Sequence, residues 1–308
     1  MKKCALIFTL VFISVLHISC SSRNHLNVEF EDNLSDNIFN TDIEKYISDN
    51  QLIYDTDTDT EIIIPIVINI FSGPEGFPDL LSWFITAYDP GDINRTENLH
   101  LAGSRINNRV VQPNQVFSFG IAISPITEAS GYKYGIIYSG GRRVPGLAGG
   151  VCQVLSTLYN AVLYSNMEIT ERYPHQFMVN YLDNPRDATL FFPGKDFKFR
   201  NNRKNPIMIK SKVENGIIVV DIFGTKEPDD YEVELYTQII NTVPFRTTTV
   251  YDDSLPKGET IIEVPGVNGG TAELYVILKK DGNVVSRTLR SRDTYIPHPQ
   301  TIRIGTRE

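Results

Sequence analysis

Cys152 is the residue best suited to chemistry in this chain, and its position predicts a reactive thiol. The chain has three cysteines, of which Cys4 and Cys20 belong to an N-terminal leader. Processing of that leader leaves Cys152 without a disulfide partner, which favours a chemical use for the thiol. It also directly precedes a segment of helical periodicity, and a helix N-terminus stabilises a thiolate. A cysteine that packs as a small hydrophobic residue is the alternative.

A nucleophilic thiol needs a base, usually a neutral imidazole. Four of the five histidines lie beyond the leader. Among them, His175 opens a predicted strand over 176–182 in the same unit as the cysteine, so we expect it to be the base. A third group should orient the imidazole. A simple hairpin about the turn at 183–186 would place Asp196 opposite His175, which favours Asp196. A bulge or a longer excursion would favour Asp187 instead. A surface or capping histidine is the alternative for His175.

Other candidate site residues flank the cysteine. Gln153, or backbone N–H groups at the helix start, would serve as oxyanion donors. Gly149 and Gly150 either let a substrate chain approach the backbone or only provide a turn conformation. With Tyr132, these two glycines are the candidate ligand-binding residues. We expect no metal ion and no cofactor.

The first twenty residues are typical of a secretory leader. Lys2 and Lys3 precede an apolar stretch from Ala5 to Leu16 that is too short to span a bilayer. The run Ser19-Cys20-Ser21-Ser22 resembles the lipobox of bacterial lipoproteins, with Cys20 as the lipidated residue. Cleavage near Ser19 without lipidation is the alternative. Either reading predicts an extracytoplasmic protein, membrane-anchored in the first case.

The charge is unevenly distributed. Residues 21–61 hold eleven acidic and two basic side chains, whereas the whole chain has a net charge of −8, so the rest is almost neutral. Such a balance offers no basic surface for nucleic acid. The acidic stretch is predicted to be a solvated tether. A calcium loop is the alternative for its aspartates, but the required glycine and terminal glutamate are missing.

Beyond the tether, the pattern predicts two domains, 62–226 and 229–308, divided by a polar, turn-rich break. The first mixes strands with two helices, over 95–108 and 154–166, and later strands over 176–182, 188–192 and 197–200. Cys152 falls on the buried stripe of the second helix. An Asn-Gly pair at 215–216 predicts a hairpin. The second domain shows alternating strands and turn glycines. The fold class is therefore α+β, a helix-start cysteine packed on antiparallel strands, plus an all-β extended module.

Several motifs of the first domain occur in a fixed order: Pro113 to Phe119, Gly131-Tyr132-Lys133, Gly149-Gly150-Val151-Cys152-Gln153, Glu171 to His175, and Asp187-Ala188-Thr189 with Asp196 to Asn201. Together they resemble the VanW family over roughly 62–224. The resemblance implies an exported protein associated with peptidoglycan and leaves the activity open. This chain departs from the family pattern at four positions. It has Ala148 and Asn114 where the pattern has glycine, Gly120 where it has asparagine, and Gln176 where it has serine.

The C-terminal glycines resemble those of the five-glycine surface module. They are Gly258, Gly266, Gly269 or Gly270, Gly282 and the closing Ile304-Gly305-Thr306. The resemblance implies an extended β module that binds wall sugars. Turn glycines of any small β domain are the alternative.

These inferences lead to two functional hypotheses for an envelope protein. In the first, Cys152, His175 and Asp196 or Asp187 carry out amide or acyl transfer on wall peptides. In the second, the chain is a non-catalytic adaptor or scaffold that holds wall glycans or takes part in a glycopeptide response. The expected partners are peptidoglycan or wall glycans, and a membrane through Cys20.

Overall fold

The computed structural model describes residues 16–21, 25–30, 62–64, 73–139 and 142–308, in two compact units over 1–71 and 72–308. In the first unit, β1 (Leu16–Ser21) lies between β2 (His25–Phe30) and β3 (Ile62–Ile64), antiparallel to both. Most of the predicted leader (1–20) and acidic tether (21–61) lies outside the described residues.

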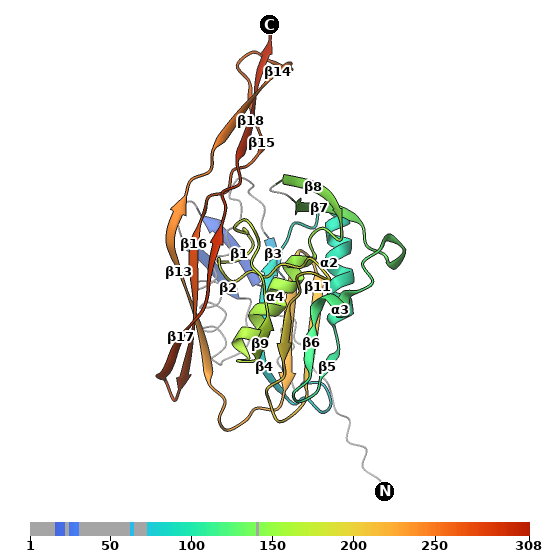
Figure 1. Ribbon diagram of the computed structural model, residues 1–308, viewed down its shortest axis with the longest axis vertical. Coiled ribbons are helices and arrows are strands. Elements are labelled where there is room, and N and C mark those ends of the chain that lie inside the picture. Colours follow the sequence, from blue (N-terminus) through green and yellow to red (C-terminus); the bar gives the residue numbers. More distant parts are fainter. Residues whose placement is uncertain (1–15, 22–24, 31–61, 65–72, 140–141) are drawn as a thin grey trace. The chain divides into compact units, whose positions relative to one another are not determined.

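The two predicted helices of the first domain are confirmed. α2 (Ile93–Ile106) begins after Asp92, whose side chain accepts a hydrogen bond from Arg95 N at 3.1 Å. Leu99, Ala102 and Ile106, which lie on one face of α2, are fully buried. α4 (Val151–Tyr164) is buried along nearly its whole length, because it packs between the main sheet and other parts of the chain. Figure 1 shows both helices against the strands of this domain.

α4 rests on a four-stranded antiparallel sheet of order β4-β12-β11-β5. Alternate residues of β4 and β12 are buried, as one covered face requires. Two hydroxyl contacts dock the helix on β4: Ser82 Oγ donates to Ala161 O at 2.6 Å, and Thr86 and Thr157 share a hydrogen bond of 2.8 Å. The sheet strands are β4 (Asp79–Ala87), β5 (Arg109–Val111), β11 (Ile207–Glu214) and β12 (Ile217–Gly224).

Smaller elements surround this layer pair. β10 lies between β6 and β9, and β7 pairs with β8 in a hairpin. Their bounds are β6 (Val116–Ser118), α3 (Phe119–Ile123), a 3₁₀ turn (Glu128–Ser130), β7 (Tyr134–Ser139), β8 (Arg142–Leu147), β9 (Glu168–Glu171) and β10 (Lys198–Arg200). The predicted hairpin is present: Asn215 and Gly216 both have positive φ, 50° and 79°, between β11 and β12.

The strands predicted over 176–182 and 188–192 are wrong. The chain between β9 and β10 is irregular, apart from an isolated bridge between Phe191 and Lys195. Some of its backbone groups bond to side chains; Val179 N, for example, donates to Asn184 Oδ1 at 3.2 Å. Others bond to backbone groups outside any strand ladder, as Thr189 N does to Tyr173 O at 2.9 Å. This irregular segment carries both His175 and Asp187.

The C-terminal module is all β and forms two three-stranded sheets, one of β13, β16 and β17 and the other of β14, β15 and β18, so the chain passes between the two sheets three times (Figure 1). In the first, β16 lies between β13 and β17, all antiparallel. In the second, β18 is parallel to β14 and antiparallel to β15. The strands are β13 (Glu232–Val243), β14 (Thr247–Pro256), β15 (Thr260–Val264), β16 (Gly269–Lys280), β17 (Asn283–Tyr295) and β18 (Gln300–Arg307). The described chain is thus mostly β with few helices.

Candidate functional site

Cys152 is the second residue of α4, and the preceding glycines fix how the helix begins. Gly150 is the N-cap with φ of 103°, and it offers α4 no side-chain cap. A Cβ on Gly149 would lie 2.7 Å from the carbonyl carbon of Gly135 in β7. Gly150 is needed for its positive φ, and Gly149 is needed because a side chain there would meet the backbone of β7. The local structure therefore explains both glycines without a ligand. A role for them in ligand binding stays a prediction.

The sulfur of Cys152 is half-buried and faces the irregular segment. Leu190 N–H donates to Sγ at 3.4 Å, and the Thr189 hydroxyl lies 3.8 Å from it. Burial raises the pKa of the thiol, but a hydrogen bond from His175 and its positive charge, with the Leu190 and Thr189 contacts, outweigh burial and lower it overall. The arrangement therefore favours a thiolate paired with an imidazolium.

His175 is held by Asp187. The Nδ1 atom of its ring lies 2.6 Å from Asp187 Oδ2, and its backbone N–H donates to the same oxygen at 2.7 Å. Because Nδ1 faces a carboxylate, Nε2 is the nitrogen directed to the sulfur. Burial lowers the pKa of His175, but the Asp187 and Cys152 contacts overcome it and raise the pKa to about 9. The side chain keeps 18% of its surface exposed, so solvent reaches the ring.

Asp187 is completely buried, yet it stays ionised. Burial raises its pKa, but His175, Arg172 and Tyr295 overcome this and lower it to about 2. Arg172 Nη2 lies 3.2 Å from Oδ1, and the Tyr295 hydroxyl donates to Oδ1 at 2.5 Å. Each carboxylate oxygen therefore has two donors, as a buried charge requires.

Asp196, the sequence-favoured orienter of His175, lies elsewhere. It accepts hydrogen bonds from Ser118 Oγ at 2.5 Å and from Gly120 N at 2.8 Å, at the start of α3. Asp196 is not opposite His175 because the segment between the two residues is irregular and does not form the hairpin expected from the sequence. The structure brings Asp187, the second candidate, to the imidazole.

The side chain of Gln153 points into the core, away from the sulfur. Its Nε2 donates to Thr86 Oγ1 at 3.1 Å and to Ala87 O at 2.7 Å, and its Oε1 accepts from Arg95. The carboxamide is consequently not available as an oxyanion donor. The backbone offers an alternative: Val151 N and Gln153 N donate to Ala148 O and Gly150 O, while no partner for Cys152 N–H is found among the described residues.

Tyr132 lies in the core. It is 1% exposed, and its hydroxyl donates to Ile123 O at 3.0 Å beneath the guanidinium of Arg105. These contacts give it a packing role and leave no surface for a ligand.

Sequence patterns missed Thr189, Leu190, Arg172 and Tyr295. The strip from Asp187 to Leu190 is held against α4 by Ser156, whose Oγ accepts from Ala188 N at 3.0 Å. Thr189 and Leu190 follow Asp187 directly, so the Asp187-Ala188-Thr189 motif was a partial signal for them. Tyr295 lies 108 residues from Asp187, and no local pattern could have linked the two.

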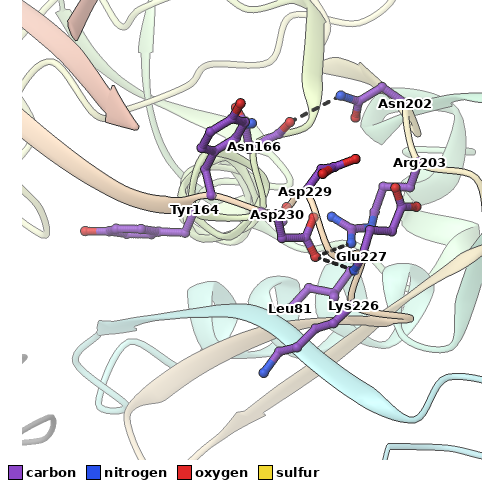
Figure 2. A pocket seen from close by; sticks show the side chains of 11 residues that line it. Leu81, Tyr164, Asn166, Asn202, Arg203, Lys226, Glu227, Asp229 and Asp230 are labelled. Atoms are coloured by element: carbon purple, nitrogen blue, oxygen red, sulfur yellow. Dashed lines mark hydrogen bonds and ion pairs between the residues drawn. The ribbon is translucent and has the colours of Figure 1, made fainter. Parts of the chain in front are cut away.

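A pocket of about 230 Å³ lies away from this site, at the connection between the two domains (Figure 2). Arg203 Nη2 donates to Asp230 Oδ2 at 2.6 Å there, and Glu227 N donates to the same oxygen at 2.8 Å. These contacts fix the turn that leads into β13. None of the side chains lining this pocket contacts the sulfur or the imidazole.

In the described part of the chain, no three His, Cys, Asp or Glu side chains gather as a metal site would need. Within the same residues, no helix combines the length and apolar character needed to cross a membrane.

With the fold and the site in view, comparisons with known proteins identify the two domains. Residues 94–223 match the family model of the VanW like protein, and residues 236–307 match that of the G5 domain. The chain therefore carries a VanW-like domain followed by a G5 domain. Cys152, His175 and Asp187 fall in the first, and Tyr295 in the second.

Two curated relatives match the VanW-like part. The uncharacterized protein YoaR of Bacillus subtilis is 36% identical over 145 residues, which cover 47% of this chain and 48% of YoaR. The vancomycin B-type resistance protein VanW of Enterococcus faecalis is 26% identical over 142 residues, 44% of this chain and 51% of that protein. The chain spans about half the length of the curated relatives it matches.

Among solved structures, the G5 domain of IgA1 protease is 21% identical, with 27% of this chain and all of that chain covered and a TM-score of 0.17. The structure titled HP0197-G5 is also 21% identical, with 25% and 100% coverage and a TM-score of 0.15.

Proposed function

We propose that this protein is an envelope protein associated with peptidoglycan, and that its VanW-like domain catalyses amide or acyl transfer on wall peptides. The observation that carries the catalytic part is the contact of a helix-start thiol with an imidazole that a buried carboxylate orients. The contacts run from the thiol to the imidazole and from the imidazole to the carboxylate, which is the arrangement of nucleophile, base and orienting group used in covalent catalysis.

The proposed reaction begins with the Cys152 thiolate attacking the carbonyl carbon of a peptide amide. The tetrahedral intermediate collapses, the C–N bond breaks, and the His175 imidazolium gives its proton to the leaving amine. A thioester remains on Cys152. Water or an acceptor amine then attacks it and loses a proton to the imidazole, the C–S bond breaks, and the thiolate returns. Asp187 keeps the ring oriented and its Nδ1 protonated throughout.

The oxyanion of this intermediate requires N–H donors near the sulfur. The Cys152 amide at the positive end of α4 is one candidate, because it lacks a partner among the described residues. Arg95 is a second source of positive charge close by. Its Cγ would lie 2.7 Å from a Cβ on Gly150, and burial lowers the pKa of its guanidinium. It suits a substrate with a free carboxylate, such as a wall stem peptide.

The wall as target rests on the pairing of the two domains. The relative from Enterococcus faecalis is named as a vancomycin B-type resistance protein, and the resemblance to its family implies an association with peptidoglycan. In this proposal the G5 domain holds wall glycan, and Cys20 carries a lipid that anchors the protein outside the cytoplasm. Replacing Cys20 with alanine should then move the protein from the membrane fraction to the soluble extracytoplasmic fraction.

Alkylation of the thiol tests the catalytic proposal. The full mature protein is treated with iodoacetamide from pH 4 to pH 10, and mass spectrometry follows the peptide that contains Cys152. We expect a midpoint well below the value of about 8.5 for a free thiol. The His175→Gln variant should return the midpoint to that value or above. A wild-type midpoint at or above the free-thiol value would refute the proposed catalytic role.

A non-catalytic adaptor is the second candidate, favoured by exposed aromatic side chains on the G5 strands. Tyr236 and Tyr251 are 43% and 74% exposed, and such rings suit contacts with sugar faces. If the chain is only an adaptor, Cys152→Ser will preserve both wall binding and cellular phenotype. In that case Tyr251→Ala should weaken retention on purified peptidoglycan and also remove the phenotype.

A further inference from the structure

The carboxylate that orients His175 forms hydrogen bonds with residues of both domains. Asp187 belongs to the VanW-like domain, and the Tyr295 hydroxyl that donates to its Oδ1 at 2.5 Å belongs to the last residue of β17 in the G5 domain. Both side chains are almost fully buried, with Asp187 at 0% and Tyr295 at 1% exposure. Water therefore cannot replace this hydroxyl without rearrangement.

Arg172 forms a second route between the domains. Its Nε donates to the main-chain oxygen of Asp187 at 2.8 Å, and its Nη2 lies 3.2 Å from Asp187 Oδ1. The same guanidinium pairs with Asp293 of β17, which also accepts from Ser291 Oγ at 3.0 Å. Arg172 is only 7% exposed, so solvent screens its positive charge poorly. Asp187 and Asp293 both pair with this one guanidinium.

The residues next to His175 are also attached to the G5 domain. Ile296 N donates to Gln176 O at 3.0 Å, and the Phe177 ring packs edge-on against His298 with centroids 4.9 Å apart. The module thus contacts the His175 segment on the carboxylate side and along the following residues.

From these contacts we infer that Tyr295 and Asp293 are positioning residues, through which the G5 domain sets the orientation and charge balance of the Cys152–His175–Asp187 site. This inference rests on the proposed function, because it concerns the same site. A module expected only to hold wall polymer would then be a structural part of the catalytic centre.

The two residues should act on the imidazole in opposite directions. The Tyr295 hydroxyl stabilises the negative charge of Asp187 by donating a hydrogen bond to it. Loss of this hydrogen bond makes the carboxylate more basic and therefore raises the pKa of His175. Asp293 competes with Asp187 for the positive charge of Arg172. When Asp293 is neutralised, Arg172 pairs with Asp187 alone, and the pKa of His175 falls. The titratable and charged groups around the imidazole and its carboxylate are Cys152, Asp187, Arg172, Tyr159, Tyr181, Arg290, Asp293 and Tyr295.

An NMR titration of the His175 ring tests this inference. The full mature protein is labelled with ¹³C at histidine Cε1, and His175→Gln assigns the resonance. We expect Tyr295→Phe to raise the His175 midpoint and Asp293→Asn to lower it, each by about half a pH unit or more. Ser291→Ala is the milder second variant on the Asp293 route. It should raise the midpoint slightly, because Asp293 without that donor attracts Arg172 more.

Two matched controls come from the same module. Tyr275→Phe removes a hydroxyl that donates to Glu273 at 2.8 Å, and Asp252→Asn removes a carboxylate that pairs with Arg303 and accepts from Ser254. Neither should move the His175 midpoint, since neither contacts the site.

The outcomes separate the two proposals. An ordinary His175 midpoint and an unactivated thiol in the wild-type protein would overturn the proposed function. A perturbed wild-type midpoint that neither Tyr295→Phe nor Asp293→Asn moves would overturn only the present inference. Shifts of the same sign in both variants would also overturn it, because they indicate general loosening of the segment.

Discussion

The two domains bury their side chains in different ways. The VanW-like domain has a packed interior in which Leu99, Leu155, Leu158 and Ile218 are fully buried between helices and sheet. In the G5 domain, β14 is exposed along nearly its whole length, and large apolar residues such as Leu289 remain in contact with solvent. The first domain is therefore stabilised mainly by apolar burial, and the second mainly by its backbone hydrogen-bond ladders.

The buried part of the G5 domain is concentrated in one region. Ala272, Leu274, Asp293 and Tyr295, all near the paired ends of β16 and β17, are less than a tenth exposed. Two of these four contact the carboxylate cluster of the VanW-like domain. A sheet with one uncovered face needs a partner layer for stability. Here that partner includes the His175 segment, so the module's stability and the site's geometry are linked.

The largest expected effect tests this contrast in burial. Leu158→Ala opens a cavity on α4 and should lower the free energy of unfolding by about 4 kcal/mol. Leu289→Ala, at a position that is 44% exposed on β17, should change it by less than about 0.5 kcal/mol. Urea unfolding monitored by circular dichroism measures both. Similar losses in the two variants would show that the module has a core of its own.

Acid unfolding tests the cluster at the junction. The folded pKa of Asp187 is lowered to about 2 from 3.8, so its stabilisation is present above pH 4 and is lost as the pH falls through about 2. Between pH 6 and pH 2, the wild-type protein should lose about 2 kcal/mol more stability than Asp187→Asn. Equal losses, measured by urea unfolding at both pH values, would mean that the carboxylate is not held in its charged form.

Regular elements of this fold could be predicted because their signals are local. The helical periodicity over 154–166 indicated α4, and the Asn215-Gly216 pair indicated the hairpin of β11 and β12. The alternating strands of the module were equally visible, and the structure is all β over this part of the chain. Each depends on residues within a few positions of one another.

The arrangement around the thiol could be predicted only in part. Cys152 and His175 stood out by residue type and position, but the choice between Asp187 and Asp196 depended on the path of an irregular segment. That path is set by side-chain contacts such as Ser156 with Ala188, and not by a strand register. The Tyr295 contact depends on how two domains dock, which no periodicity encodes.

Gly149 and Gly282, one in each domain, are required for different reasons: the first because a side chain would clash, the second because of its backbone conformation. An alanine Cβ at Gly149 would lie 2.7 Å from the Gly135 backbone, so Gly149→Ala should cost about 1.5 kcal/mol and shift the alkylation midpoint of Cys152. Gly282, in the module, has φ of 76° and open space around it. Gly282→Ala should cost about 1 kcal/mol through backbone strain alone and leave the midpoint unchanged. An unaltered midpoint in Gly149→Ala would show that the start of α4 tolerates movement of β7.

The smallest expected effect concerns Ala148, where the family pattern has glycine. Its φ of 60° is in the left-handed region, which disfavours alanine. Ala148→Gly removes that strain but increases the freedom of the unfolded chain and loses a buried methyl group, so we expect a net gain of only about 0.5 kcal/mol. Thermal unfolding measures it, and Ala102→Gly in the interior of α2 provides the opposite case, a loss of about 1 kcal/mol or more. A loss at Ala148 as well would mean that packing of the methyl group against its neighbours outweighs the backbone strain, and that this chain has adapted its turn before Cys152 to alanine.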